Sequence, residues 1–405
     1  MTQTSSGPKG SDRQLHLQCP VCDGQSGAPI DSAVTVPVMM NRVYGSAQDA
    51  RNAARATLSL ARCQDCGFVW NSRFEPSIMA YDESYENDQT LSSAFVAHLT
   101  TRARDVIASV PEAEPIDALE VGCGQGRFLQ ELASVGGGRL RSLEGFDPAW
   151  RGSGPEGPGG ARIHRRYFDA TSAQQLSHAP NVIVSRHTIE HVADPIAFLR
   201  AIRAALGPES QASVFIETPC IEWILQRGAM QDFCYEHCSL FDAPSLATAL
   251  KRAGFIDARV EHVFGGQYLW AHAQATALPQ GLAFTRDDVT LPQIDSARRS
   301  FIAHWRQELD KAAQDGPVAL WGASTKGVTF ALLNDPQAQL IDHVVDINPA
   351  KQGRYLALSG LAVLSPADSI QRGPQTIFVM NPNYLEEIRE SLAAQGSNPR
   401  LVPIN

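Results

Sequence analysis

One glycine-rich segment restricts the fold of this chain more than any other feature: IDALEVGCGQGRFLQELA, residues 116–133. Its apolar first half predicts a buried strand, and Gly122, Gly124 and Gly126 follow at once. Apolar residues at positions 128, 129 and 132 then recur with the spacing of an amphipathic helix. A strand, a glycine turn and a helix form the repeating unit of doubly wound α/β domains. We therefore expect an α/β, Rossmann-like domain around this unit.

Strand and helix patterns alternate over residues 76–275, which we assign to this first α/β domain. Further strands are predicted from LEGFD, NVIVSRH and ASVFIETP, and RVEHVFGGQYLWAHAQA predicts two strands around a glycine turn. Residues 276–314 are predicted as a linker followed by a helix. A second strand–glycine–helix unit, GPVALWGASTKGVTFALLN, then begins a second Rossmann-like α/β domain over residues 315–405.

Four of the eight cysteines lie in the predicted N-terminal module, residues 15–75: Cys19 and Cys22 in CPVC, and Cys63 and Cys66 in CQDC. Two C-x-x-C pairs about 40 residues apart are typical of a tetrahedral zinc site with four cysteine ligands. Four sulfur ligands leave no open position on the ion, so the zinc is predicted to be structural. Two unrelated pairs of buried or redox cysteines are the alternative.

Length, charge and hydropathy limit the partners and the location. A chain of 405 residues suggests two or three domains. A net charge of −9 without a basic run disfavours nucleic acid, and no apolar run is long enough for a membrane span. Residues 1–14 are polar and are predicted as a disordered head without a secretory signal. We expect a cytoplasmic monomer or small homo-oligomer that acts on a small molecule.

Acidic residues follow two of the predicted strands beside the glycine turn. Asp147 ends the strand in GFDPAW, where a carboxylate can accept hydrogen bonds from both ribose hydroxyls of a nucleoside. Glu120 precedes the glycines and adds a negative charge, which disfavours a pyrophosphate and favours a ligand with a cationic centre. S-adenosylmethionine (SAM) fits these residues better than NAD. A nucleotide-binding domain of another kind is the alternative.

The segment ALEVGCGQGRFL is similar to motif I of the class I SAM-dependent methyltransferases, and RHTIEHVADPIAFLRAIRAAL resembles the region of their fourth strand. The resemblance implies that SAM is the cofactor and that YFDA lies near its adenine. His187, at the end of the predicted fourth strand, is then placed to face the methyl group. The residues expected at the cofactor are Glu120, Gly122, Gly124, Gly126, Asp147, Asp169 and His187.

The order of the three domains, with GASTKG and VVDINPAKQGRYL in the last, resembles the sugar C-methyltransferase family over roughly residues 15–400. The segment CGFVWNSRFEPSIMAYDESYEN is similar to that family's junction between its zinc module and its SAM domain. Members methylate a carbon beside a ketone on a nucleotide-linked deoxysugar. The resemblance therefore implies C-methylation next to a carbonyl, on such a sugar or on a related natural-product intermediate.

Such a reaction needs a base, a donor for the enolate oxygen and close alignment with the sulfonium. In the family, the segment corresponding to QDFCYEHCSLFDAP carries a Glu and a His assigned to proton transfer, which are Glu236 and His237 by resemblance. His191 in EHVADP takes the place of another active-site histidine, and Tyr85 matches a tyrosine of the lead-in segment. His187 is a further catalytic candidate. The alternatives are a core or helix-capping role for His237 and a turn-forming role for EHVADP.

A metal site within this segment is the competing interpretation, because Cys234, Glu236, His237 and Cys238 all carry ligand atoms. Neighbouring residues of a strand point to opposite faces, which argues against one shared ion. Two other functions stay open. An O- or N-methyltransferase of a natural product would depend less on His237, and a non-catalytic zinc-module scaffold would transfer no methyl group.

The C-terminal domain is expected to hold the remote part of the acceptor, as the resemblance implies, or to serve packing alone. Lys326 lies at the start of the helix after WGASTKG, where it can meet a phosphate. The same turn, with Asp346 after the next strand, invites an NAD interpretation, but its spacing is not G-x-G-x-x-G. The family's motif tyrosine and first histidine are replaced by Cys234 and Tyr235. The residues predicted to bind the acceptor are Tyr235, Lys326 and Asn381.

Overall fold

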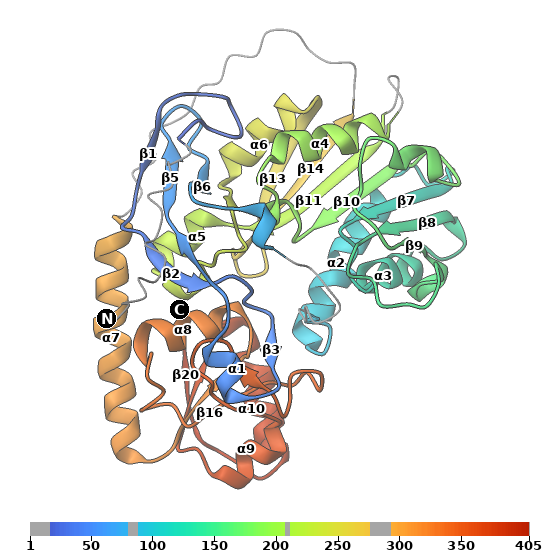
Figure 1. The fold of residues 1–405 in the computed structure, drawn as a ribbon. Helices are drawn as coiled ribbons and strands as arrows, with labels where there is room; N and C mark the ends of the chain where they lie inside the picture. The colour runs from blue at the N-terminus through green and yellow to red at the C-terminus, as the bar shows by residue number, and fades with distance from the viewer. Residues whose placement is uncertain (1–16, 80–87, 207–210, 276–292, 405) are drawn as a thin grey trace, which may run out of the picture.

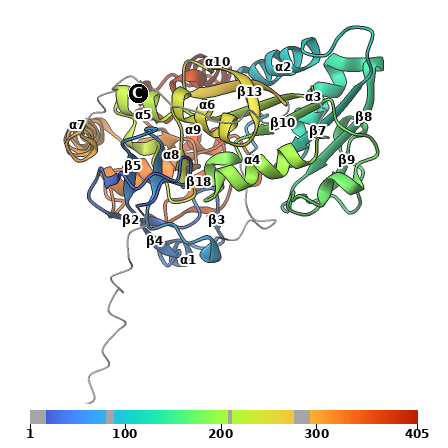
Figure 2. The same cartoon turned by 90° about the horizontal axis from the view of Figure 1, so that it is seen from above.

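A computed structural model describes residues 17–79, 88–206, 211–275 and 293–404 of the chain (Figure 1). The predicted head (1–14), most of the predicted linker (276–292) and Tyr85 lie outside the described residues. No helix in the described ranges is long and apolar enough to span a membrane. Figures 1 and 2 place β8 (Leu140–Phe146) and β9 (Arg162–His164) at one end of the molecule and α7 (Ile294–Asp315) at the other.

The central domain is built on a seven-stranded sheet in the order β13-β14-β11-β10-β7-β8-β9. The strands beside β14 pair with it in antiparallel fashion, and the remaining neighbours pair in parallel. All six residues of β7 are buried, as expected of a parallel strand covered on both faces. Besides β8 and β9, the strands of this sheet are β7 (Ile116–Val121), β10 (Val182–Arg186), β11 (Ser213–Pro219), β13 (Phe255–Val263) and β14 (Tyr268–Ala275).

Helices cover both faces of this sheet, which confirms the predicted Rossmann-like fold. Buried residues of α2 (Ser93–Ala108) and α3 (Arg127–Gly136) form one core with one face of the strands. Those of α4 (Pro195–Ala204) and α6 (Ala243–Arg252) form another core with the opposite face. Phe128, Leu129 and Leu132 are buried on α3, as the helical spacing predicts.

The C-terminal domain has a second, wholly parallel sheet in the order β18-β16-β15-β19-β20. The strand order reverses beside β15, and such switch points are where open α/β sheets bind ligands. The strands are β15 (Val318–Trp321), β16 (His343–Val345), β18 (Val363–Leu364), β19 (Thr376–Val379) and β20 (Arg400–Pro403), and the helices are α8 (Thr325–Asn334), α9 (Pro366–Arg372) and α10 (Leu385–Ala394).

Helix α7, which the sequence analysis grouped with the linker, packs into the C-terminal domain. Phe301 and Trp305 are buried on it, and their rings lie 6.1 and 6.0 Å from that of Phe330 on α8. The apolar stripe of α7 is covered by this core, so the helix belongs structurally to the domain that follows it.

The N-terminal region, predicted as one module, contacts both domains. Its strands β1 (Gly27–Pro29), β5 (Leu60–Cys63) and β6 (Val69–Asn71) form a sheet with β12 (Ser239–Leu240) of the central domain. Its β3 (Val43–Tyr44) instead pairs with β17 (Tyr355–Leu356) of the C-terminal domain. The remaining elements here are β2 (Val34–Pro37), β4 (Arg55–Leu58) and α1 (Ala47–Arg51).

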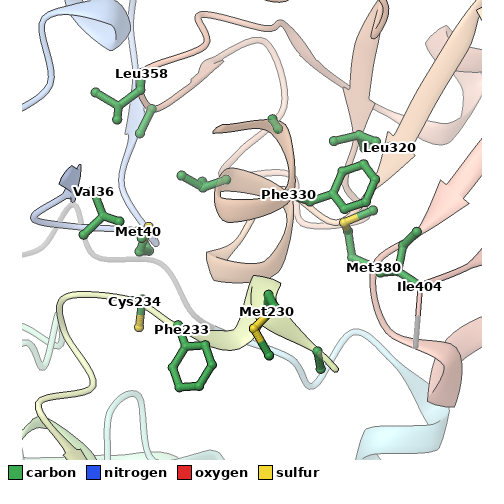
Figure 3. Close-up of a cluster of buried hydrophobic side chains, with 14 of the residues drawn as sticks. Val36, Met40, Met230, Phe233, Cys234, Leu320, Phe330, Leu358, Met380 and Ile404 are labelled. Carbon is green, nitrogen blue, oxygen red and sulfur yellow. The ribbon is translucent and has the colours of Figure 1, made fainter. Parts of the chain in front are cut away.

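One hydrophobic core joins the three regions (Figure 3). Val36 and Met40 reach it from the N-terminal region, and Phe233 and Cys234 from the segment before β12. Phe330, from the C-terminal domain, is fully buried in it. The QDFCYEHCSLFDAP segment therefore lies where the three regions meet, flanked by α5 (Ile221–Arg227) and α6.

Replacing Phe330 by alanine tests this core. We expect the Phe330→Ala substitution to lower the free energy of unfolding by about 3–5 kcal/mol, because it leaves a cavity among packed rings. Denaturant unfolding of the full chain measures the change. Ile78→Ala is the control, since Ile78 is 41% exposed. Equal effects of the two substitutions would contradict the assignment of Phe330 to a shared core.

Candidate active site

A cavity of about 310 Å³ lies at the carboxyl ends of β7, β8 and β10. The carboxylate of Asp147 lines it and is held by the glycine turn, accepting hydrogen bonds from the backbone N–H of Gly124 at 2.7 Å and of Ala149 at 2.7 Å. Burial raises the pKa of Asp147. The glycine turn and the next strand are thus joined at the place where the sequence analysis predicts the nucleoside.

Glu120 lines the same cavity and is 2% exposed. Among the described residues its Oε2 atom has no hydrogen-bond partner. Burial raises the pKa of Glu120 to about 8, although the nearby charge of Arg186 opposes that shift. A buried acid with an open oxygen suits a cationic ligand, which agrees with the reasoning from the sequence.

The three predicted glycines differ in their positions. Gly122 and Gly124 line the cavity, and Gly122 has a φ of +77°, where a Cβ atom would lie 2.1 Å from Thr188 Oγ1. Gly126 does not line it. It precedes α3, and a Cβ atom there would lie 2.9 Å from Ile163 Cδ1. Close packing at the start of α3 accounts for this glycine, and a cofactor contact at Gly126 stays a prediction.

Asp169 was predicted near the adenine, but the described cavity wall does not include it. Its exposed carboxylate accepts hydrogen bonds from the backbone N–H of Thr171 at 2.8 Å and from Ser172 Oγ at 3.2 Å, which stabilise the following turn. Tyr167 and Phe168 line the cavity instead. Within YFDA, sequence reasoning therefore missed the two aromatic residues that line the cavity.

A second cavity of about 470 Å³ lies between the central and C-terminal domains. It shares four lining residues with the first cavity: Asp88, Gln89, His187 and His191. On its far side it reaches the turn after β15 and the start of α8. A ligand in the first cavity and one in the second can therefore meet beside His187 and His191.

His187 stands at this junction in a strained conformation. Its φ is +49°, which is uncommon for a residue other than glycine and is frequent at functional sites. Its Nε2 atom lies 2.8 Å from Glu217 Oε1, and its Nδ1 atom lies 3.5 Å from Glu190 Oε1. Burial lowers the pKa of His187, but the two carboxylates outweigh burial and raise the pKa to about 9. The ring is positively charged at neutral pH.

His191 and His237 face each other, with ring centroids 4.9 Å apart and ring planes at 81°. His237 lines the second cavity, and its Nδ1 atom has no hydrogen-bond partner in the described part of the chain. Burial, with His191 nearby, lowers the pKa of His237 to about 3, and burial also lowers the pKa of His191. Both rings are neutral at pH 7, so each has an unprotonated ring nitrogen.

Glu236 does not serve as the partner of His237, which corrects the prediction from the sequence. Its Oε2 atom accepts a hydrogen bond from the backbone N–H of Met40 at 3.0 Å, toward the N-terminal region. Burial raises the pKa of Glu236 to about 8. The carboxylate beside the histidines is that of Glu190. One of its oxygens lies within 4.8 Å of a ring nitrogen of His191 and of a ring nitrogen of His237. The position of Glu190 next to His191 in EHVADP was the sequence feature that could have identified it.

A buried network of charged side chains, centred on Glu217, lies behind these histidines. Glu217 on β11 contacts His187, lies 2.9 Å from Arg186 Nη2, and lies 3.0 Å from Nε2 of His98 on α2. Hydrogen bonds and charges from these groups hold the pKa of Glu217 well below its usual value, against the effect of burial. Sequence reasoning identified neither Glu217 nor His98, because the two are far apart along the chain.

The three residues predicted to bind the acceptor occupy different surroundings. Tyr235 is buried in the core, where its hydroxyl accepts a hydrogen bond from the backbone N–H of Glu75 at 2.8 Å. It does not line the second cavity, and its contact with the acceptor stays a prediction without support from this geometry. Lys326 and Asn381 do line it. Lys326 Nζ lies 2.6 Å from Asp232 Oδ2.

The four N-terminal cysteines form one cluster. The Sγ atoms of Cys19 and Cys66 are 3.6 Å apart, those of Cys22 and Cys63 are 3.5 Å apart, and all four lie within 4.8 Å of one another. A zinc ion bound to four sulfurs at about 2.3 Å separates them by about 3.8 Å. The cluster has the size that such an ion requires.

The affinity for SAM is expected to depend on the ionisation of Glu120. Because its pKa lies at about 8, the affinity should rise as the pH increases from about 7 to about 8.5, when the group becomes a carboxylate facing the cationic ligand. Calorimetric titration with SAM across this range measures the trend. The Glu120→Gln variant should bind more weakly and lose most of the trend. An unchanged trend in that variant would contradict the role of Glu120.

Comparison with known proteins agrees with this arrangement. Residues 95–258 match a family model described as a methyltransferase domain, and residues 293–400 match one described as a C-methyltransferase C-terminal domain. The C-methyltransferase NovU of Streptomyces niveus is 23% identical over 393 residues, which cover 92% of this chain and 91% of that protein.

Other similarities cover less of the chain. The ubiquinone biosynthesis O-methyltransferase of Cereibacter sphaeroides (strain ATCC 17025 / ATH 2.4.3) is 31% identical over 114 residues, 26% of this chain and 42% of that protein. The solved CurJ carbon methyltransferase is 14% identical with a TM-score of 0.34, over 46% of this chain and 56% of its own. The family matches and the relative of nearly full length show that the chain belongs to the class I SAM-dependent methyltransferases and carries the C-terminal domain of the C-methyltransferases.

Proposed function

We propose that the protein methylates a carbon next to a carbonyl group of a small acceptor bound in the second cavity, with SAM in the first. The observation that carries this proposal is a pair of histidines in different surroundings beside the cavities: His187 lies between two carboxylates, and His237 has an open Nδ1 atom. His237 is neutral with an open nitrogen, and His187 is positively charged. Removing a proton from carbon requires a base and a positive group near the enolate, and both are present.

The reaction begins with proton transfer to His237. The C–H bond beside the carbonyl breaks, its electron pair moves into the enolate, and the proton moves to the imidazole nitrogen. The positive charge of His187 stabilises the enolate across the cavity junction. SAM held in the first cavity would supply an electrophilic methyl group to the enolate carbon and would leave as a neutral thioether. His191, beside His237, keeps that ring oriented toward the acceptor.

The acceptor in this proposal is a nucleotide-linked keto-deoxysugar or a related natural-product intermediate. The second cavity extends to the switch point of the C-terminal sheet, where Gly322, Lys326 and Asp346 line it. Asp346 Oδ2 accepts a hydrogen bond from the backbone N–H of Ala323 at 2.8 Å, which orders the turn before α8. This crevice holds the remote part of the acceptor, with Lys326 and Asn381 as contacts.

We also propose that Cys19, Cys22, Cys63 and Cys66 hold a structural zinc ion. The sulfur separations fit the ion. Cys63 ends β5, a strand of the sheet that reaches β12 beside His237. β5 pairs with β6, β6 pairs with β12, and the backbone N–H of Asn71 donates to Cys238 O at 2.9 Å. The ion therefore stabilises the sheet that holds the residue next to His237.

Loss of the base should abolish the carbon chemistry. In deuterated water, the wild-type protein with SAM and a panel of keto-sugar nucleotides is expected to exchange the hydrogen next to the carbonyl and to methylate that carbon, as followed by mass spectrometry. His237→Ala should reduce both by about 10²–10⁴-fold, the usual contribution of a general base. His304→Ala, on the exposed side of α7, is the control. Methylation of oxygen or nitrogen without exchange would support the O- or N-methyltransferase alternative instead.

The zinc proposal predicts one zinc atom per chain in the purified protein, measured by elemental mass spectrometry. Cys63→Ser should lose the metal and unfold at a lower temperature, since one ligand of four is removed. Cys234→Ser is the matched control for metal content, because Cys234 is a buried cysteine that belongs to none of the possible metal-binding groups of the described residues. A metal-free wild-type protein with the same thermal stability would contradict the proposal.

A further inference from the structure

Glu190 occupies the centre of the histidine cluster. It lies in the short 3-10 turn Ile189–His191 after β10 and is 1% exposed. Its Oε1 atom is 3.5 Å from His187 Nδ1, and its Oε2 atom accepts a hydrogen bond from Thr218 Oγ1 at 3.1 Å. Its carboxylate also lies within 4.8 Å of ring nitrogens of His191 and His237. Three imidazole rings thus surround one buried carboxylate.

The charged groups around the cluster come from several elements. Glu217 on β11 faces His187, Arg186 on β10 and His98 on α2. On the other side, Lys326 on α8 pairs with Asp232 at 2.6 Å. Glu217 is therefore engaged with a guanidinium and two rings. Glu190 is the buried carboxylate that directly faces the cavity-side histidines.

The position of Glu190 matters for the balance of charge among the buried groups. With His191 and His237 neutral, the charges of Glu190 and Glu217 offset those of Arg186 and His187. A proton that arrives on His237 adds a positive charge in a site that water reaches poorly, which is unfavourable without a nearby carboxylate. Burial raises the pKa of Glu190, but the hydrogen bond and charge of His187 outweigh burial and lower it to about 2, so the group is ionised throughout the working range.

We infer that Glu190 is the positioning residue of the active site: its carboxylate holds His187 as an imidazolium and balances the charge of His237 while that ring carries the acceptor's proton. The second half of this inference rests on the proposed function. The first half concerns the charge state of His187 before any acceptor binds. Glu190 thereby takes the role that resemblance assigned to Glu236.

The test is a pH titration of the imidazole rings by NMR, on full-length protein labelled with ¹⁵N in its histidines and saturated with S-adenosylhomocysteine. Glu190→Gln keeps the shape of the side chain and an acceptor for Thr218 but removes the charge. We expect the proton affinity of His187 to fall by at least about tenfold, a shift of one pH unit or more in its midpoint. The His187→Gln variant identifies the signal of that ring.

Glu236→Gln is the matched control, because it also removes a buried carboxylate close to His237 in the chain. It should leave the midpoint of His187 unchanged. A merely structural role of Glu190 would lower the thermal midpoint of the Gln variant without moving the titration. Glu190→Asp should restore part of the proton affinity.

Three outcomes would overturn the inference. The midpoint of His187 could be the same in Glu190→Gln and wild type, or Glu236→Gln could shift it equally. Alternatively, one equivalent of Mn²⁺ could selectively broaden the signals of His187, His191 and His237, which would reassign Glu190 as a metal ligand. None of these results depends on methyl transfer. A failure of the deuterium-exchange assay would remove the proposed reaction and leave the titration result intact.

Discussion

The active site depends on how the short segment before β12 is held. Phe233 and Cys234 are buried in the core shared by the three regions, and Glu236 accepts a hydrogen bond from the backbone of Met40. Directly after His237, Cys238 O accepts from Asn71 N, and Ser239 Oγ donates to Val192 O at 2.7 Å. With the residues on both sides fixed in this way, His237 is left facing the cavity. Its position is a product of interdomain packing.

The same packing explains why so many ionisable groups can be buried together. An isolated buried charge is strongly unfavourable, so acids and bases must be placed in compensating sets. Arg186, His187, Glu190 and Glu217 form such a set on the adjacent strands β10 and β11 and the turn after β10. The compensation leaves His191 and His237 uncharged at the edge of the cavity. His187 is charged because two carboxylates contact it, whereas burial outweighs the effect of Glu190 at His191 and His237.

Two Rossmann-like sheets contribute to two neighbouring cavities that share lining residues. The first cavity lies at the carboxyl ends of strands in the central sheet, and the second reaches the switch point of the C-terminal sheet. The N-terminal region pairs with both domains, through β6 with β12 and through β3 with β17. This double pairing sets the separation of the two sheets. The depth of the second cavity therefore depends on a region that contributes few residues to its lining.

Local patterns in the sequence were sufficient for the two α/β domains, for SAM as the cofactor and for the grouping of four cysteines. Glycine turns, apolar periodicity and C-x-x-C spacing act over a few residues, so they survive in any compact arrangement of the chain. Glu120, Asp147, Gly122 and Gly124 line the cavity because the strand–turn–helix unit places them there directly.

Only the tertiary structure decided which acid faces the histidines. Glu236 and Glu190 each neighbour a histidine in sequence, but Glu236 points toward Met40, and Glu190 is brought to His237 by the fold. Likewise, Tyr235 is directed into the core and Asp169 is used in a turn. Sequence adjacency does not fix the side on which a residue is buried. That side is set by the neighbours supplied from distant segments, and it determined the chemistry of this site.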